Sequence, residues 1–473
     1  MRGGIADLLR HLLRAALGAF LLMGCITAAV AQEPPLDIPP SGVLTKSPYG
    51  ISVDDWVLYP EIRGYATGSN NLYESPFAPV SAVGLGLSPK LVAEWSNGIH
   101  ATTFYGNTDN TFYNQSQNNV SNANAGFRQS YSPLPDLKFS VQGDYTHLTV
   151  SGVVNSIPGL LASPGAITLA NGNTALPNGT VVSPSGQVVG QINPALLVQA
   201  RGTAINPTDT FTGLASVEKI FNHGIVNLTG VIAQTDYTQP SLIVPTQNYT
   251  TETFTGNAAF WLGPALYAFG NGTVVSEVFA QPNAFSIAGA NQDTTSYTVR
   301  GGIGTRQIDL FRAAAYFGYQ GSNEEMSGAA GGAIYGASLS YYPTGALTLT
   351  AAIDETINIA SPGAASNLAL SLPTQSALIV PLSSSTRITA PTLTAAYKIT
   401  EQWGAFGTFG LVHVDFLNSP EIENAWLVDL VLRYQMSLHW SFNWEYQFTP
   451  IVANVPQTSS NRSYFYAGAT YKF

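Results

Sequence analysis

The stretch that decides the fold is HWSFNWEYQF, residues 439–448, close to the C-terminus. Aromatic side chains occupy every second position, and polar residues occupy the positions between them. Because successive side chains of a β-strand point to opposite faces, this alternation predicts a strand with one aromatic face and one wet face. A soluble sandwich would bury the aromatic face, whereas an outer-membrane barrel would turn it to lipid. The aromatic face consists of Trp440, Phe442, Trp444, Tyr446 and Phe448.

The composition of the whole chain favours the barrel. Only 10% of the 473 residues are charged, against about 25% in ordinary globular proteins. Apart from the N-terminal segment, no apolar run approaches the roughly 20 residues that a membrane-spanning helix needs. The net charge of −10 argues against a nucleic-acid partner.

The N-terminus reads as an export signal. Three arginines precede an apolar run over 15–30, which ends in the small-x-small sequence Ala29-Val30-Ala31. This arrangement predicts a signal peptide over 1–31. A lipoprotein signal ending at Cys25 and an uncleaved anchor helix remain as alternatives. Since Cys25 is the one cysteine, we expect a mature chain without disulfides.

The remainder divides into a Pro-rich periplasmic segment over 32–55 and a barrel over 56–473. Short turns alternate with longer polar loops, which is the outer-membrane pattern. Eight turns that join nine hairpins predict about 18 antiparallel strands, with the long third external loop over 151–206. The turns lie near 96–98, 132–136, 222–224, 262–264, 307–309, 343–345, 399–402 and 435–439.

Two segments resemble a known family, YGISVDDWVLYPEIRGYATGSNNLYES (49–75) and LGLSPKLVAEWSNGIHATTFYGN (85–107). They are similar to the putative β-barrel porin type 2 family of proteobacterial outer membranes. Where that family has an Asp-Asn pair, this chain has Asn70-Asn71, which weakens any reading of that loop as a charged site. The matching residues are Pro60, Gly64, Tyr65, Asn70, Asn71, Ser88, Pro89, Trp95 and Ser96.

The resemblance implies a bacterial outer-membrane location and an assembly signal in the last strand. That signal would be Tyr471 and the terminal Phe473, presented to the barrel-assembly machinery. Some members of the family are associated with extracellular polysaccharide, so polysaccharide export or assembly is an alternative to passive diffusion of small hydrophilic solutes. The other partners that we expect are outer-membrane lipid and lipopolysaccharide, and a homo-oligomer is possible.

A barrel of about 18 strands is wide enough for a water-filled lumen, and its inward charges would set its selectivity. Three of these, Arg300, Arg306 and Arg312, fall on consecutive strands and could form a basic wall. The alternative is that inward charges pair with one another and only keep the lumen hydrated. The long loops over 151–206 and 360–385 are almost uncharged, which fits a neutral solute. The predicted pore-lining residues are Arg300, Arg306, Arg312, Arg433, Lys138, Asp144, Asp429 and Glu445.

An enzyme at the barrel rim is the contrasting hypothesis. His413 and Asp415 share one face of a strand, as a base and its orienting acid would. The sequence has no Gly-x-Ser-x-Gly elbow, His-Glu-x-x-His motif or phosphate-binding loop. We therefore expect a lumen-facing polar pair rather than a catalytic one, and we assign no catalytic, cofactor or metal site.

Overall fold

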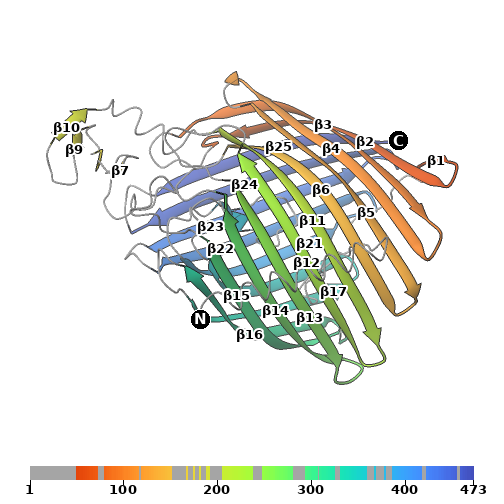
Figure 1. Ribbon diagram of the computed structural model, residues 1–473. Coiled ribbons are helices and arrows are strands. Elements are labelled where there is room, and N and C mark those ends of the chain that lie inside the picture. The colour runs from red at the N-terminus through yellow and green to blue at the C-terminus, as the bar shows by residue number, and fades with distance from the viewer. Residues whose placement is uncertain are drawn as a thin grey trace.

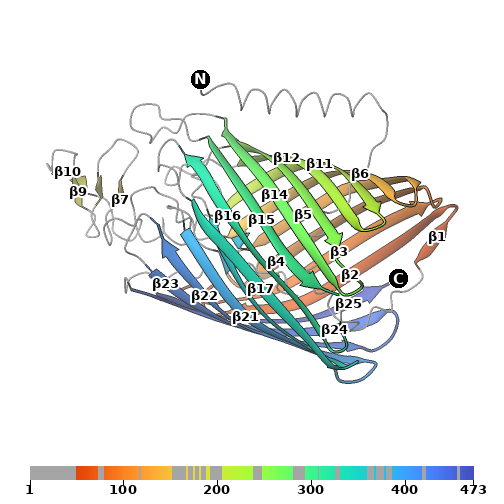
Figure 2. The same cartoon turned by 90° about the horizontal axis from the view of Figure 1, so that it is seen from below.

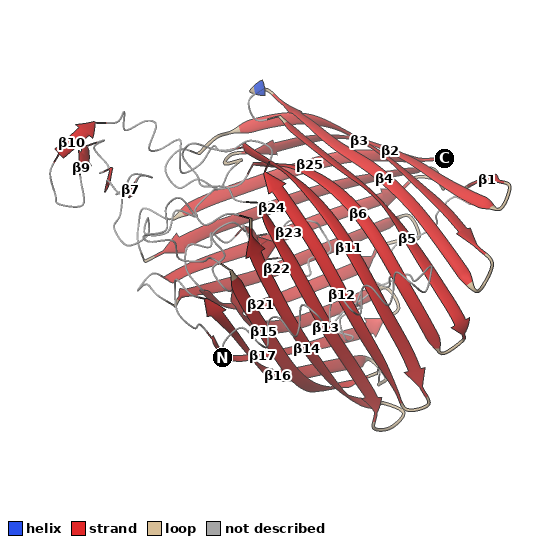
Figure 3. Cartoon of the chain, in the orientation of Figure 1, coloured by secondary structure: helices blue, strands red, loops and turns tan. Residues whose placement is uncertain are grey.

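The computed structural model contains one closed antiparallel β-sheet (Figures 1 and 3). It describes residues 50–72, 79–116, 119–151, 167–168, 174–175, 180–182, 188–191, 205–237, 248–280, 293–306, 308–324, 331–358, 367–368, 378–379, 386–417, 422–454 and 459–473. Each strand of the barrel pairs with its neighbour in the chain, and the last strand pairs with the first. The predicted 18-strand barrel is confirmed.

The barrel strands are 12 to 17 residues long and tilted in one closed wall (Figure 2). They are β2 (Trp56–Ser69), β3 (Ala82–Ser96), β4 (His100–Tyr113), β5 (Val120–Leu134), β6 (Leu137–Ser151), β11 (Ile205–Phe221), β12 (Gly224–Tyr237), β13 (Tyr249–Trp261), β14 (Leu266–Phe279), β15 (Thr294–Thr305), β16 (Phe311–Glu324), β17 (Gly331–Thr344), β18 (Leu347–Asn358), β21 (Thr386–Lys398), β22 (Trp403–Phe416), β23 (Ile422–Gln435), β24 (Trp440–Ala453) and β25 (Ser460–Lys472).

The alternation that decided the fold is the alternation of the barrel wall. Trp440 and Tyr446 of β24 are exposed on the outer face. Gln447, which follows Tyr446 in the chain, is buried on the inner face. Register carries the same face to the next strand, because Leu430 of β23 lies opposite Tyr446 and is 53% exposed. Large apolar side chains on an outer face belong in lipid, and closure leaves no backbone edge unpaired there.

The two ends of the barrel sequence complete this closure. β25 pairs with β2 from Glu61 to Ser69, and the backbone nitrogen of Phe473 donates a hydrogen bond to the carbonyl of Pro60 at 3.1 Å. Beyond that point the edge of β2 pairs with the short strand β1 (Ile51–Val53), which folds back on it. The C-terminus therefore lies beside β1 and β2 (Figure 1). The pairing of β1 covers a sheet edge that would otherwise be open.

Polar side chains fix the tight turns between hairpin strands. In the turn after β3, Asn97 Oδ1 accepts hydrogen bonds from the backbone nitrogens of Ile99 and His100 at 3.1 and 2.7 Å. Gly98 in the same turn has a φ of +87°, a conformation that glycine adopts at little cost. Such a turn sets the register of its hairpin, so the sequence at 96–98 fixes which residues of β3 and β4 lie opposite one another.

Several sequence predictions fall outside the described residues. The signal peptide over 1–31 and most of the Pro-rich segment over 32–55 are among them. Within the long loop over 151–206, four short strands form a separate sheet: β7 (Ile167–Thr168), β8 (Thr174–Ala175), β9 (Thr180–Val182) and β10 (Val188–Gln191). Two more, β19 (Asn367–Leu368) and β20 (Leu378–Ile379), pair within the loop over 360–385. The described segments contain no helix that is long and apolar enough to cross a membrane.

An ion pair at the short-turn end gives a test of the structure by pH. Lys219 of β11 donates a hydrogen bond to Asp136 in the turn between β5 and β6, and this bond lowers the pKa of the Asp136 carboxyl. A lowered pKa in the folded state stabilises the fold above the usual pKa of aspartate, and this stabilisation is lost as the pH falls through the folded-state pKa. We expect Lys219→Met to return the pKa of Asp136 to its usual range, as measured by carbon-13 NMR titration of that carboxyl. The matched control Lys90→Met should leave it lowered, and an Asp136 pKa that stays low in Lys219→Met would contradict the pairing.

Candidate functional site

The inner wall of the barrel is the candidate site. Val299 of β15 is 62% exposed on the outer face, so the neighbouring Arg300 projects inward near the middle of the strand. The same parity holds on β6, where Val141 and Gly143 carry the outer face and Asp144 projects inward. On β23 and β24, Leu430 and Tyr446 face outward. Of the eight residues predicted to line the pore, Arg306 lies just past the end of β15, over Trp261. The other seven lie on the inner face of their strands: Lys138, Asp144, Arg300, Arg312, Asp429, Arg433 and Glu445.

Tyrosine side chains bridge three strands on this inner wall. Tyr316 of β16 lies directly opposite Gly336 of β17, which lies opposite Asp354 of β18. The Tyr316 hydroxyl donates a hydrogen bond to Asp354. The ring therefore crosses β17 at the glycine and reaches the carboxylate two strands away. We call this arrangement a tyrosine bridge.

The first strands of the barrel repeat the tyrosine bridge twice, once directly and once through a glutamine. Tyr65 of β2 lies opposite Gly86 of β3, and its hydroxyl donates a 2.5 Å hydrogen bond to Asp109 of β4. Tyr105 of β4 lies opposite Gly126 of β5, which lies opposite Asp144 of β6. The Tyr105 hydroxyl accepts a 3.2 Å hydrogen bond from Nε2 of Gln142, which donates a second bond to Asp144 at 2.7 Å. The members of the two bridges are Tyr65, Gly86, Asp109, Tyr105, Gly126, Gln142 and Asp144.

The bridges need glycine on the strand that each ring crosses. A Cβ atom at Gly86 would lie 2.0–2.4 Å from atoms of the Tyr65 ring, and one at Gly336 would lie 2.2 Å from Cε1 of Tyr316. Such distances are far inside van der Waals contact, so any side chain at these positions would displace the ring. The inner-face glycines therefore have a specific role, which is to let tyrosine rings lie flat against the wall.

Each arginine of these bridges is compensated by a nearby acceptor. Nη2 of Arg63 lies 3.3 Å from Oδ2 of Asp109, and both side chains are about one third exposed. Arg128 donates two hydrogen bonds to Oε1 of Gln142, at 3.2 and 3.0 Å. The guanidinium of Arg300 lies 5.2 Å from the centroid of the Tyr316 ring, a distance typical of a cation–π contact.

The three predicted arginines do not form one wall. Arg300 belongs to the Tyr316 bridge near the middle of its strand. Arg306 and Arg312 instead flank the turn between β15 and β16, and Arg306 stacks over Trp261 at 4.3 Å. Arg312 interacts with Tyr267 of β14, which packs edge-on against Trp261. The second pair therefore lies at the short-turn mouth, separate from Arg300.

Between the bridges, the inner wall of β11 to β14 carries amides and hydroxyls. Nδ2 of Asn271 donates a 2.6 Å hydrogen bond to Asn257, and the Thr229 hydroxyl donates a 2.9 Å bond to Asn227. Asn227, Asn257 and Asn271 lie in one line of register across three strands. The same line continues to Arg300 of β15. This part of the wall offers hydrogen bonds without charge.

Sequence reasoning missed the residues of the bridges apart from Asp144 and Arg300. Alternation shows that Tyr65, Tyr105 and Tyr316 face inward, but it does not show what lies beside them. The short turn between β17 and β18 was a usable signal, because it fixes the register that puts Gly336 opposite Asp354. The glycines opposite Tyr65 and Tyr316 lie on the next strand, beyond a long-loop connection whose register the sequence does not reveal.

The candidate enzymatic pair does not face the lumen, and that expectation was wrong. His413 and Asp415 share a face of β22 with Phe409, which is 46% exposed on the outer surface. His413 Nε2 lies 3.2 Å from Asp415 Oδ1, and Nδ1 lies 2.8 Å from Asn424 Oδ1. Both ring nitrogens thus face oxygen atoms of a polar patch on the outer wall. In the described part of the chain, no group of three or more His, Cys, Asp or Glu side chains could hold a metal ion.

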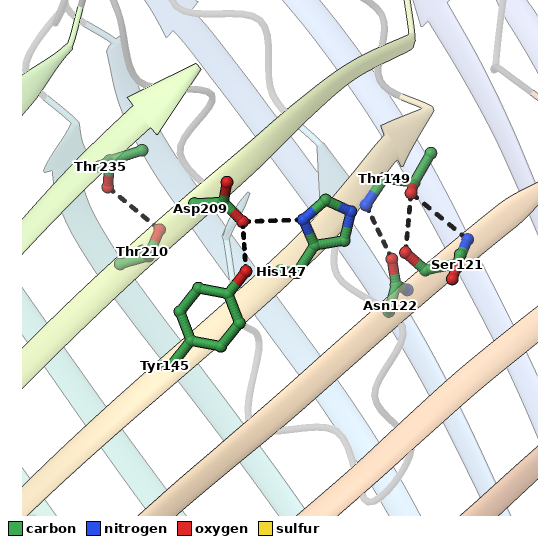
Figure 4. A network of polar contacts seen from close by, with 8 residues as sticks. All are labelled: Ser121, Asn122, Tyr145, His147, Thr149, Asp209, Thr210 and Thr235. Atoms are coloured by element: carbon green, nitrogen blue, oxygen red, sulfur yellow. Dashed lines mark hydrogen bonds and ion pairs between the residues drawn. The ribbon is translucent and has the colours of Figure 1, made fainter. Parts of the chain in front are cut away.

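A second polar patch lies on the outer wall near the long-loop end (Figure 4). Asp209 of β11 accepts hydrogen bonds from the Tyr145 hydroxyl at 2.7 Å and lies 2.8 Å from His147 Nδ1. Tyr145 packs on Phe211, which is 54% exposed on the outer face. The patch thus begins directly above an aromatic pair, where an interfacial girdle gives way to polar headgroups.

Solved structures of outer-membrane barrels resemble this chain. OpdO of Pseudomonas aeruginosa is 12% identical, with a TM-score of 0.49, and the alignment covers 89% of this chain and 98% of that one. OpdQ of the same organism is 9% identical, with a TM-score of 0.47 and the same coverage. The siderophore receptor PirA from Acinetobacter baumannii is 9% identical, with a TM-score of 0.45, over 88% of this chain and 80% of that one.

No curated protein matches this chain in sequence. The profile of the family described as "Putative beta-barrel porin 2" matches residues 193–473. The match lies C-terminal to the segments over 49–75 and 85–107 that suggested the family. Because it covers more than half of the chain, the protein belongs to this family of β-barrel porins, as the sequence predicted.

Proposed function

We propose that the protein is an outer-membrane channel that lets small hydrophilic solutes diffuse passively across the bilayer. The observation that carries this proposal is the inner wall, which presents paired charges, tyrosines and amides around a closed barrel. Barrels of 16 to 18 strands generally enclose an aqueous channel. Membership of the porin family supports the same function.

A second candidate is passage of extracellular polysaccharide through the same barrel. The tyrosine bridges and the amides of β12 to β14 favour it, because a polymer of sugars needs aromatic and hydrogen-bonding surfaces along its path. We also propose that the outer polar patches at His147 and His413 contact lipopolysaccharide headgroups, since both lie on the outer wall close to the long-loop end.

The channel is tested by the conductance of refolded mature protein in a planar lipid bilayer. We expect steady single-channel steps, because solvated inner-wall charges hold water in the lumen. A chain that ends at Asn454, and therefore lacks β25, is the matched control, since β24 and β2 then have unpaired edges and the barrel does not close. Absence of single-channel current steps from the intact, folded protein would contradict the channel proposal.

A further inference from the structure

Two tyrosine bridges form one continuous band on the inner wall of β2 to β6. Tyr65 reaches Asp109 on β4, and Tyr105 on that same strand accepts a hydrogen bond from Gln142 on β6, which also bonds Asp144. Arg63 and Arg128 lie within the band and contact Asp109 and Gln142. We call these residues the inner band: Arg63, Tyr65, Tyr105, Asp109, Arg128, Gln142 and Asp144.

The rings of the inner band form flat surfaces. The Tyr65 ring lies so close over Gly86 that a Cβ there would be 2.0–2.4 Å from its atoms. At Gly126 a Cβ would lie 2.6 Å from the Tyr105 hydroxyl. The Tyr65 ring thus lies against Gly86, and it also contacts the Arg63 guanidinium at 5.3 Å and the Tyr466 ring at 5.2 Å. The Tyr105 side chain places its hydroxyl end over Gly126. Aromatic rings held rigidly in this way can stack on an apolar face of a ligand.

The polar groups beside the rings are paired but not fully used. The Arg63–Asp109 pair leaves both side chains about one third exposed. A guanidinium carries five N–H donors and a carboxylate accepts about four hydrogen bonds, so the contacts described leave donors and acceptors side by side. Such adjacent donor and acceptor sites match two neighbouring hydroxyl groups of a sugar ring.

The local charge compensation argues against an ion as the ligand. Arg63 acts with Asp109, and Arg300 acts with Asp354 through Tyr316. A free ion gains little from a wall whose charges are already paired. The Tyr316 bridge also stands half-way around the barrel from β4, so two walls of the same chemistry face one another across the lumen.

We propose that the inner band is a binding subsite for neutral polyhydroxylated rings, namely sugars. The apolar face of a pyranose stacks on Tyr105, and adjacent hydroxyls exchange hydrogen bonds with the Arg63–Asp109 pair and with Gln142. This inference rests on the proposed channel function and names the substrate class of that channel. It applies equally to free sugars and to the units of a polysaccharide.

The test measures how sugars reduce the single-channel current of the full-length mature protein. D-glucose and maltohexaose are the probes, and polyethylene glycols of matched molecular mass are controls for simple exclusion. We expect the sugars to block the current at concentrations where the matched polymers do not. Stronger binding of maltohexaose than of glucose would indicate that the subsite serves a polymer, whereas equal binding per molecule would indicate free sugars.

Variants separate stacking from general damage to the pore. Tyr105→Leu should weaken sugar block by about threefold to tenfold, as expected for loss of an aromatic contact, while Tyr105→Phe retains most of the block. Asp109→Asn should weaken it while retaining the side-chain shape. Tyr319→Leu, on the outer face of β16, is the matched control and should leave the block unchanged.

The failure of this inference can be told apart from the failure of the channel. A protein that opens steadily but is blocked by sugars no better than by the matched polymers would overturn the sugar subsite alone. Block that is equal in Tyr105→Leu and in the unchanged protein would also overturn it. A folded protein that never opens would instead remove the channel on which the inference rests.

Discussion

Replacing Val299 by arginine is expected to destabilise the barrel more than any other single change considered above. Val299 lies near the middle of β15 and is 62% exposed on the outer face. An arginine at the bilayer midplane on the lipid side of a barrel costs about 2–4 kcal/mol of folding free energy, because its charge must leave water. The measurement is reversible unfolding of the protein in lipid vesicles by guanidinium chloride, followed by tryptophan fluorescence.

The adjacent residue supplies the matched control. Thr298 precedes Val299 on β15 but projects to the inner wall, beside Arg300. Thr298→Arg should therefore cost much less, since its guanidinium reaches the lumen. Equal costs for the two variants would mean that β15 has no lipid face, and the assignment of inner and outer walls would then be wrong.

The fold was accessible from the sequence because its signal is repeated in nearly every strand. Outer and inner positions alternate with period two, and five of the eight short turns carry Gly, Pro or Asn. Trp440 to Phe448 is the clearest example, but β3 gives the same reading, with Leu85 and Leu87 exposed on its outer face. A pattern that recurs in most of 18 strands tolerates errors in individual strands.

The site was less accessible because it depends on register across several strands. The prediction that Arg300 projects inward needs only parity along one strand. The tyrosine bridge at Tyr316 needs three strands in register, and the loop over 325–330 between β16 and β17 does not reveal where pairing resumes. The same holds for Tyr65 and Gly86, which are joined through a long loop.

The outward position of His413 shows a second limit. At the long-loop end of β22 the polar His413 and Asp415 alternate with apolar residues, so alternation alone predicts that the polar face is the lumen face. The structure instead turns the apolar face, with Val412 and Val414, inward, where it joins a buried hydrophobic cluster. Register resolves this, because His413 lies opposite Asn424 and on the same face as Phe409 and Trp426. The polar patch is thus a continuation of the lipid-facing wall.

The second large effect is expected for ion selectivity when the carboxylates of the bridges are neutralised. In Asp109→Asn combined with Asp354→Asn, Arg63 and Arg300 lose the charges that compensate them. A single uncompensated charge about 7 Å from a permeating ion, at an effective dielectric constant of about 40–80, changes the free energy of that ion by about 0.6–1.2 kcal/mol. Because this charge attracts chloride and repels potassium by the same energy, the ratio of chloride to potassium permeability should rise by about eightfold to sixtyfold, as measured from the reversal potential in a KCl gradient. Asp209→Asn removes an equal charge from the outer wall and should leave the ratio unchanged. If the double variant and this control gave the same reversal potential, the paired charges of the bridges would not face the path of the ions.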